Sequence, residues 1–261
     1  MTINSDKAWE ILGKTDPYWS VLSCDKYHIE NLNSESLDEF FQSGRRHIEN
    51  VLNIVRCHVD SSFVPKRTLD FGCGVGRIVF PLSSLCESVT GVDISDSMLK
   101  IGETLCLQLG ISNVKFVKSD DTLSQVCDRF DFIHSYIVFQ HIPRNRGEKI
   151  VDRLIDILED DGIGVLHFTY FIQKSSKLSR FIYWGRNNIP FLNGLFNVFY
   201  FKKPFKSPMI QIHEYNLTTL FQILHKKGCH NCHVKFSQHE TPRTNICGLV
   251  IFFQKKALPY W

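Results

Sequence analysis

From Arg67 onward, short apolar runs alternate along the chain with segments of helical length. The runs that we expect to form strands occupy residues 67–72, 88–94, 113–120, 130–138 and 163–171. Helical spacers are expected over residues 76–86, 95–110 and 145–162. This alternation is typical of a parallel sheet covered by helices on both faces. An open sheet of that kind binds ligands at the carboxyl ends of its strands, where the strand order reverses.

The predicted fold is therefore α/β: a doubly wound, mostly parallel seven-stranded sheet with an antiparallel C-terminal strand. The 261 residues suit one such domain with additions. We expect a helical N-terminal cap over residues 1–64 and a ligand-binding core over 65–171. An insertion after strand 5 occupies 172–213, and a helix with two strands over 214–261 completes the sheet.

Composition and charge indicate which partners and which cellular compartment to expect. A net charge of +3 does not indicate nucleic-acid binding, so no nucleic-acid partner is expected. The N-terminus does not resemble a secretory signal, and no apolar stretch reaches membrane-spanning length. The nine cysteines are an odd number, and several lie within apolar patterns. They are typical of a reducing compartment, so we expect a cytoplasmic protein without a membrane span.

A glycine-rich loop follows the first predicted strand. Gly72, Gly74 and Gly76 give the spacing G-x-G-x-G, which differs from the dinucleotide pattern G-x-G-x-x-G. Asp70 precedes the loop at the end of the strand. Its carboxylate would repel a pyrophosphate but attract a ligand that carries an ammonium and a sulfonium. The loop therefore favours a cationic cofactor over NAD, although glycines alone are also compatible with a simple tight turn.

Two further acids lie at the ends of the next two predicted strands. Asp93 follows the second strand, where a carboxylate can accept hydrogen bonds from both hydroxyls of a ribose. Asp120 follows the third strand, where it can accept from an adenine amine. Three acids at three successive strand ends thus outline an amino-acid end, a ribose and a base.

Residues 67–171 resemble the class I, Rossmann-like, S-adenosylmethionine-dependent methyltransferases. The resemblance rests on DFGCGVG, GVDIS, VKFVKSDD and FDFIHSYIVFQHIP. It implies S-adenosyl-L-methionine as cofactor, with the methionine end held near Asp70 and the glycine loop, including Cys73. It further implies cofactor contacts from Arg77, Asp93, Ile94, Met98, Asp120, Asp121, Ser135 and Tyr136.

Several further residues are candidates for a general base, for substrate contacts or for additional cofactor contacts. His141 is the predicted general base, and the alternative is a backbone hydrogen bond near the cofactor. His167 and Tyr170 are candidate substrate contacts or polar groups of the core. Ser43 and Gly44 are expected just before a helix and could contact the cofactor, unless they form an ordinary helix start.

The sequence Cys-His-Asn-Cys-His at residues 229–233 has some features of a metal site. A second pair of cysteines at C-x₂-C spacing is missing, and the segment resembles the start of a strand. We therefore predict no metal.

The insertion at 172–213 is aromatic and basic. No acidic residue lies between Asp161 and Glu214, whereas lysines and arginines recur alongside many aromatic residues. We expect a substrate lid. Its cations could meet an anionic acceptor, or they could rest with the aromatics on a membrane surface. A third alternative is a small satellite core with lysines facing water.

Together these features predict methyl transfer from S-adenosylmethionine to a small molecule or glycan precursor, as in polysaccharide biosynthesis, with oxygen as the expected acceptor. The alternative is a non-catalytic subunit that binds the cofactor or its product. An NAD-dependent oxidoreductase is disfavoured by the glycine spacing and by Asp70.

Overall fold

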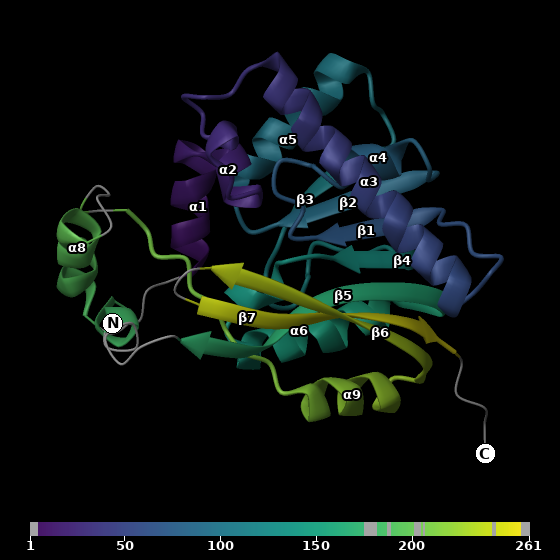
Figure 1. The fold of residues 1–261 in the computed structure, drawn as a ribbon. Helices are drawn as coiled ribbons and strands as arrows, with labels where there is room; N and C mark the ends of the chain where they lie inside the picture. The colour runs from purple at the N-terminus through teal and green to yellow at the C-terminus, as the bar shows by residue number, and fades with distance from the viewer. Residues whose placement is uncertain are drawn as a thin grey trace.

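The computed structural model describes residues 5–174, 182–186, 189–200, 205, 207–241 and 244–256. Within them, seven strands form one sheet in the order β3-β2-β1-β4-β5-β7-β6 (Figure 1). The first five strands are parallel, and β7 is antiparallel to both β5 and β6. The predicted fold class is therefore confirmed. The strands are β1 Arg67–Phe71, β2 Ser88–Asp93, β3 Val114–Lys118, β4 Phe130–Ser135, β5 Leu158–Lys174, β6 Cys229–Thr241 and β7 Thr244–Lys255.

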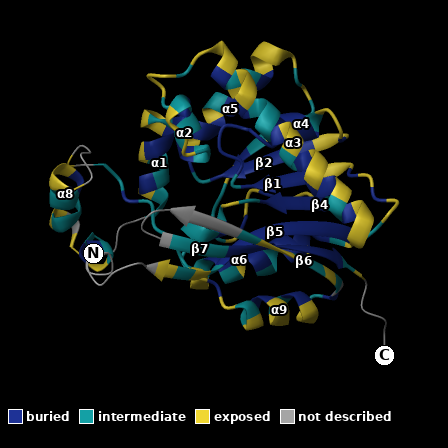
Figure 2. Cartoon of the chain, in the orientation of Figure 1, coloured by how far each residue is buried: buried dark blue, intermediate teal, exposed yellow. Residues whose placement is uncertain are grey.

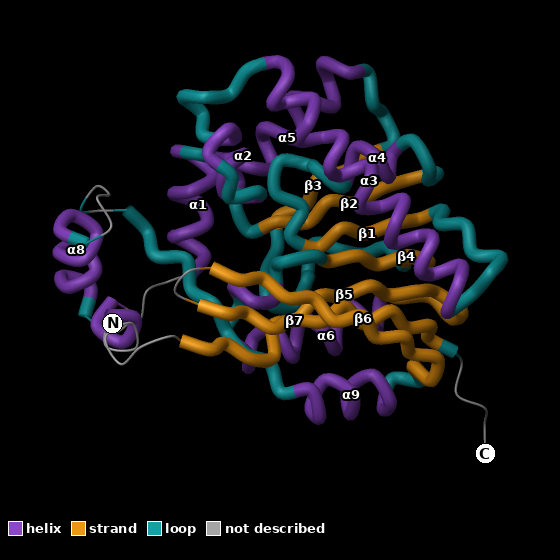
Figure 3. The backbone as a smooth tube through the Cα atoms, viewed as in Figure 1, coloured by secondary structure: helices purple, strands orange, loops and turns teal. Residues whose placement is uncertain are grey.

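Helices pack on both faces of this sheet (Figures 1 and 3). On one face, α3 Ser34–His58, α4 Val79–Ser83 and α5 Asp96–Leu109 enclose one buried cluster of apolar side chains. On the other face, α6 Arg144–Ile157 and α9 Leu217–Lys226 enclose a second cluster. The central strands are buried between these two layers, as Figure 2 shows, which accounts for their nearly continuous apolar sequence.

The N-terminal helices lie near the carboxyl ends of the first strands. They are α1 Ser5–Thr15 and α2 Pro17–Val21, followed by the short 3-10 helix η1 Asp25–Tyr27. α1 packs on α5, and the Glu10 carboxylate accepts hydrogen bonds from the hydroxyls of Ser95 (2.7 Å) and Ser97 (2.8 Å). Since Ser95 caps α5, α1 is attached to the start of the helix that follows β2.

The predicted helix start after Gly44 is wrong. α3 begins at Ser34, and Asn33 and Ser36 form a reciprocal capping box: each side chain accepts from the other residue's backbone N–H at 2.9 Å. Ser43 and Gly44 therefore lie inside the helix. A reciprocal cap at Asn33 satisfies the first N–H groups of the helix, so no second start is needed ten residues later.

The insertion after β5 separates into two parts. α8 Pro190–Phe199 stands apart from the sheet, whereas residues 207–213 return toward the strand ends (Figure 1). Lys202, Lys203 and Lys206, on which the expectation of an anionic partner depended, lie outside the described residues. Across the part of the chain that the structure describes, no helix combines the length and the apolar character needed to cross a membrane.

Candidate active site

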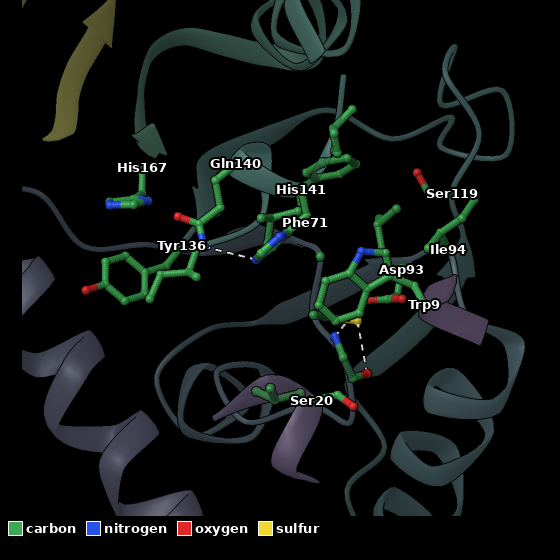
Figure 4. A pocket seen from close by; sticks show the side chains of 18 of the residues that line it. Trp9, Ser20, Phe71, Asp93, Ile94, Ser119, Tyr136, Gln140, His141 and His167 are labelled. Atoms are coloured by element: carbon green, nitrogen blue, oxygen red, sulfur yellow. Dashed lines mark hydrogen bonds between the residues drawn. The ribbon is translucent and has the colours of Figure 1, made fainter. Parts of the chain in front are cut away.

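A cavity of about 610 Å³ lies along the carboxyl ends of the strands, at the reversal of strand order between β1 and β4. The residues that line it come from the glycine loop, from the strands and the segments that follow them, and from α1, α2 and α6. Figure 4 shows some of them, among them Trp9 of α1 and Ser20 of α2. The predicted residues in this lining are Asp70, Gly72, Cys73, Gly74, Arg77, Asp93, Ile94, Met98, Asp120, Asp121, Tyr136, His141 and His167. The predicted residues outside this lining are Ser43, Gly44, Gly76, Ser135 and Tyr170.

The glycine loop turns sharply beneath the cavity. Gly72 and Gly74 have φ values of +76° and +54°, which L side chains rarely adopt. The backbone N–H groups of Gly72 and Cys73 donate to the carbonyl of Val92 at 2.7 and 3.0 Å. A Cβ at Gly72 would lie 2.2 Å from Cγ2 of Val138. Glycine is therefore required both by the backbone conformation and by the close approach of the segment after β4.

Asp93 joins the glycine loop to the start of α5. Its carboxylate accepts from the backbone N–H groups of Gly74 (2.8 Å) and Ser95 (2.9 Å). Burial raises the pKa of Asp93, and these two N–H groups act in the opposite direction. A carboxylate has about four lone-pair positions, so acceptor capacity remains on the side that faces the cavity.

Asp70 is part of a buried chain of polar side chains. Its Oδ1 accepts from Nδ1 of His134 (2.7 Å), whose Nε2 lies 3.0 Å from Nε2 of His47. Because the carboxylate can only accept, Nδ1 of His134 carries the proton of this hydrogen bond. Burial and the neighbouring His134 lower the pKa of His47 to about 2, so this ring is neutral at physiological pH.

Ser43 and Gly44 contact Arg77 instead of lining the cavity. The Ser43 hydroxyl accepts from Nη1 of Arg77 at 3.2 Å, and a Cβ at Gly44 would lie 2.0 Å from the carbonyl oxygen of Arg77. Nε of Arg77 is buried without a partner among the described residues. Burial lowers the pKa of this guanidinium. An anionic group in the cavity would satisfy the unpartnered N–H.

The two acids after β3 have different surroundings. Asp120 caps a turn, because its carboxylate accepts from the backbone N–H groups of Thr122 (2.8 Å) and Ser124 (3.1 Å) and from both hydroxyls. The hydrogen bonds from Ser124 and Thr122 hold its pKa well below the usual range. Asp121 forms a bidentate pair with Arg146, which also binds Asp6 of α1.

A connected set of neutral polar side chains lies at the other end of the cavity. Nδ1 of His141 donates to the carbonyl of Gln211 (2.8 Å), and its Nε2 accepts from the amide of Gln140 (3.0 Å; Figure 4). The Gln140 carbonyl accepts from Thr169 at 2.9 Å. Burial lowers the pKa of His141 to about 4. The indole of Trp9 lies 5.0 Å from this imidazole, edge to face.

His167 and Tyr170 were predicted together but have different positions. His167 lines the cavity beside Ser237, with 3.0 Å between Nε2 and the hydroxyl, and burial lowers its pKa to about 4. The β5–β7 register shifts between Thr169 and Phe171, and the ring of Tyr170 packs instead near Phe236. The cavity position two residues after His167 belongs to Thr169.

Several cavity or network residues were missed from the sequence. Gln140 directly precedes the predicted His141, and its position after β4 could have identified it as a site residue from the sequence. His47, His134, Arg146 and Trp9 come from helices or strand interiors, where their periodic spacing indicates only a packed face. Ser135 and Gly76 support the site from outside: the Ser135 hydroxyl donates to the carbonyl of Phe71 at 2.9 Å.

Comparison with known proteins agrees with this architecture. Residues 68–162 match the family model described as a methyltransferase domain. The release factor glutamine methyltransferase of Buchnera aphidicola is 30% identical over 174 residues, which cover 64% of this chain and 56% of that protein. The ubiquinone biosynthesis O-methyltransferase of Pseudoalteromonas translucida is 30% identical over 80 residues, covering 30% and 34%. The chain spans about half, or less, of the length of the curated relatives that it matches.

A solved structure extends the likeness over the whole fold. The N-methyltransferase NodS of Bradyrhizobium japonicum, in complex with S-adenosyl-L-homocysteine, gives a TM-score of 0.59 at 15% identity. The match covers 97% of this chain and 100% of that one, and at this identity it shows the fold alone. The strand order, the glycine loop and the acids at the strand ends define a class I methyltransferase fold. Residues 68–162 are thus similar to the methyltransferase domain family, and the fold that surrounds them is the one that these enzymes share.

Proposed function

We propose that the protein binds S-adenosyl-L-methionine in this cavity and transfers its methyl group to a small molecule. The observation that carries the proposal is the distribution of charge. The described lining has five carboxylates, from Asp6, Asp70, Asp93, Asp120 and Asp121, against the guanidiniums of Arg77 and Arg146. Such a cavity favours a cationic ligand.

The residues present fit this cofactor. The unpartnered Nε of Arg77 would receive the methionine carboxylate, and Asp70 would attract the ammonium. Asp93 would accept from the ribose hydroxyls. Ile94 and Met98 would flank the adenine, near Asp121 and the capped carboxylate of Asp120. The bound cofactor would supply a methyl group activated by its sulfonium. The remaining task of the protein is to align the acceptor and receive its proton.

The acceptor region has a different chemistry from the cofactor region. Its apolar walls come from Ile137, Val138, Ile210, Ile212 and Ile246. Its polar groups are those of Gln140, His141, His167, Thr169 and Ser237.

The two regions follow the order of the sheet. The charged groups of the lining stand around β3, β2 and β1, whereas the acceptor region lies over β4, β5, β7 and β6. No lysine or arginine occurs among the described residues of the acceptor region. An anionic acceptor would be desolvated there without a partner, so we propose a neutral, largely apolar acceptor.

His141 is the proposed proton acceptor. Its Nδ1 is held by the Gln211 carbonyl, so the lone pair of Nε2 is directed toward Gln140. An acceptor hydroxyl would replace the Gln140 amide as donor to this nitrogen. The low pKa keeps His141 neutral at physiological pH, although it also makes the ring a weak base. This arrangement suits a hydroxyl that loses its proton as its oxygen gains the methyl group, and therefore supports O-methylation.

Calorimetry with S-adenosylmethionine and S-adenosylhomocysteine is the first test. Asp93→Ala should weaken both affinities by about tenfold or more, because a hydrogen bond to a charged group contributes roughly 1.5–3 kcal/mol. Asp96→Ala is the matched control, since Asp96 is an exposed acid at the start of α5 that pairs with Lys118. Absence of binding by the wild type, or equal loss in both variants, would refute the assignment.

An acceptor screen then separates catalysis from binding. Purified protein with labelled cofactor should methylate neutral phenols or alcohols in preference to phosphorylated analogues of the same compounds. His141→Gln should lower kcat while the affinity for S-adenosylhomocysteine stays unchanged. Tight cofactor binding with no product across the panel would favour the alternative of a non-catalytic binding subunit.

A further inference from the structure

α8 has its polar side chains turned inward. Asn197 is completely buried, and Nη2 of Arg186 donates to its Oδ1 at 3.0 Å. Nε of Arg186 donates to Oδ1 of Asn193 at 2.9 Å, and the Asn197 amide donates to the carbonyl of Ser207 at 2.9 Å. The inner face of this helix is thus stabilised by hydrogen bonds to polar and charged groups.

Three apolar side chains of α8 point the other way, whereas Leu192 and Phe196 lie near Gly185. Phe191 is 64% exposed and Phe199 is 82% exposed, with Val198 also exposed. Their spacing of seven and eight residues puts them on one side of the helix. Trp184 and Phe205 add exposed aromatic area. A helix packed on a domain in water normally shows the reverse pattern, with apolar residues inside. Contiguous exposed apolar area of this kind marks a contact surface.

The charge of the same region indicates the kind of partner. Residues 162–213 contain no Asp or Glu but seven Lys and Arg residues. These are Lys174, Lys177, Arg180, Arg186, Lys202, Lys203 and Lys206. Like-charge repulsion between these cations disfavours pairing of this part of the sequence with a second copy of itself. An anionic lipid surface would instead attract them, while its interface accommodates aromatic rings.

The helical residues 182–186, which precede α8, are connected to the wall of the candidate active site. The hydroxyl of Tyr183 donates to the carbonyl of Ile212 at 3.0 Å, and Ile210 and Ile212 line the cavity. α8 stands away from the sheet on the side where the parallel strands end (Figure 1). The exposed side chains Phe191, Val198 and Phe199 are therefore not covered by the sheet.

We propose that the outer face of α8, formed by Phe191, Val198 and Phe199 with Trp184 and Phe205, docks the protein on an anionic lipid bilayer. The rings enter the interface between headgroups and acyl chains, and the net positive charge of this part of the sequence favours anionic headgroups. The hydrogen bonds of Arg186 with Asn193 and the buried Asn197 hold α8 in place while Phe191, Val198 and Phe199 face the lipid.

The test is co-sedimentation of the full chain, without cofactor, with two kinds of vesicle. One kind is phosphatidylcholine alone, and the other also contains phosphatidylglycerol. The variants are Phe191→Ser/Phe199→Ser and the matched control Leu107→Ser, which replaces an 85% exposed leucine on α5. We expect wild type and control to bind the anionic vesicles, and the double variant to bind about tenfold more weakly or worse.

The other outcomes refute the proposal. They are no binding of wild type to anionic vesicles, equal binding by the double variant, and equal loss in the Leu107 control. Light scattering tests whether a second copy of the chain covers this face instead. If the wild type forms a dimer that the double variant does not form, and neither binds vesicles, the face is a dimer contact. Because no cofactor or acceptor is present, the result is independent of the proposed methyl transfer. Circular dichroism of each variant verifies that it is folded.

Discussion

His134 and Asp70 are direct neighbours across β4 and β1, and their side chains are joined by a hydrogen bond of 2.7 Å. Both are almost completely buried, so the Asp70 carboxylate depends on this donor for its stability inside the sheet. His47 extends the chain from α3. The acid that the proposed cofactor would meet at the end of β1 is therefore oriented by two histidines from other elements.

The first prediction tests this orientation. His134→Phe removes the donor and leaves a buried carboxylate unpaired, which should cost about 3–5 kcal/mol of unfolding free energy. His134→Asn retains an amide donor and should recover part of it. S-adenosylhomocysteine affinity, measured by calorimetry, should follow the same order. If His134→Phe loses stability but binds as tightly as wild type, the histidine serves the fold and not the orientation of Asp70.

The second prediction compares two glycines with similar backbones. Gly72 and Gly110 have φ values of +76° and +67°, but a Cβ at Gly72 would lie 2.2 Å from Val138, whereas nothing lies within 4 Å of one at Gly110. Gly110→Ala should therefore cost only about 1 kcal/mol and leave cofactor affinity intact. Gly72→Ala should cost several times more and abolish measurable binding. Chemical denaturation and calorimetry provide the two readouts, and equal effects at both sites would contradict the steric argument.

The third prediction concerns the attachment of α1. Arg146 binds Asp6 of α1 and Asp121 after β3 with one guanidinium. Arg146→Ala should cost about 1 kcal/mol and raise hydrogen exchange in residues 5–15, because the pair is only partly buried. Arg144→Ala is the control, since it removes only the pair between the exposed Arg144 and Glu148 on the same helix. Unchanged exchange in α1 after loss of Arg146 would mean that its packing on α5 suffices.

The sheet and the strand-end residues were predictable because local patterns determine them. Apolar runs ending in acids predicted β1, β2 and β3 with Asp70, Asp93 and Asp120 at the cavity, and parallel pairing brings such ends to one edge. Few residue types other than glycine adopt a positive φ, so the glycine loop was also recognisable from the sequence.

The remaining parts depended on tertiary placement. His47 and His134 are 87 residues apart, and no local pattern connects them. Tyr170 is a different case, because strand alternation alone puts Thr169, and not Tyr170, on the same face as His167. The start of α3 was misplaced because Ser36 completes the capping box at Asn33, where the usual partner is Glu or Gln.

The last prediction is a loss of stability in mild acid. The pKa values of His141 and His167 are lowered by burial to about 4, against about 6.5 in an unfolded chain. The unfolded state therefore binds protons first as the pH falls. The contribution of the two neutral histidines to the free energy of unfolding is fully present above pH 6.5 and declines as the pH falls toward 4. At pH 5 the free energy of unfolding is lower by roughly 2 kcal/mol per histidine. His167→Asn should remove about that much of the decline, whereas Thr169→Val, which alters the same cavity without a titrating group, should leave the decline unchanged. Urea unfolding at pH 7.5 and pH 5 measures both, and an equal slope in wild type and His167→Asn would show that His167 accepts its proton in the folded protein.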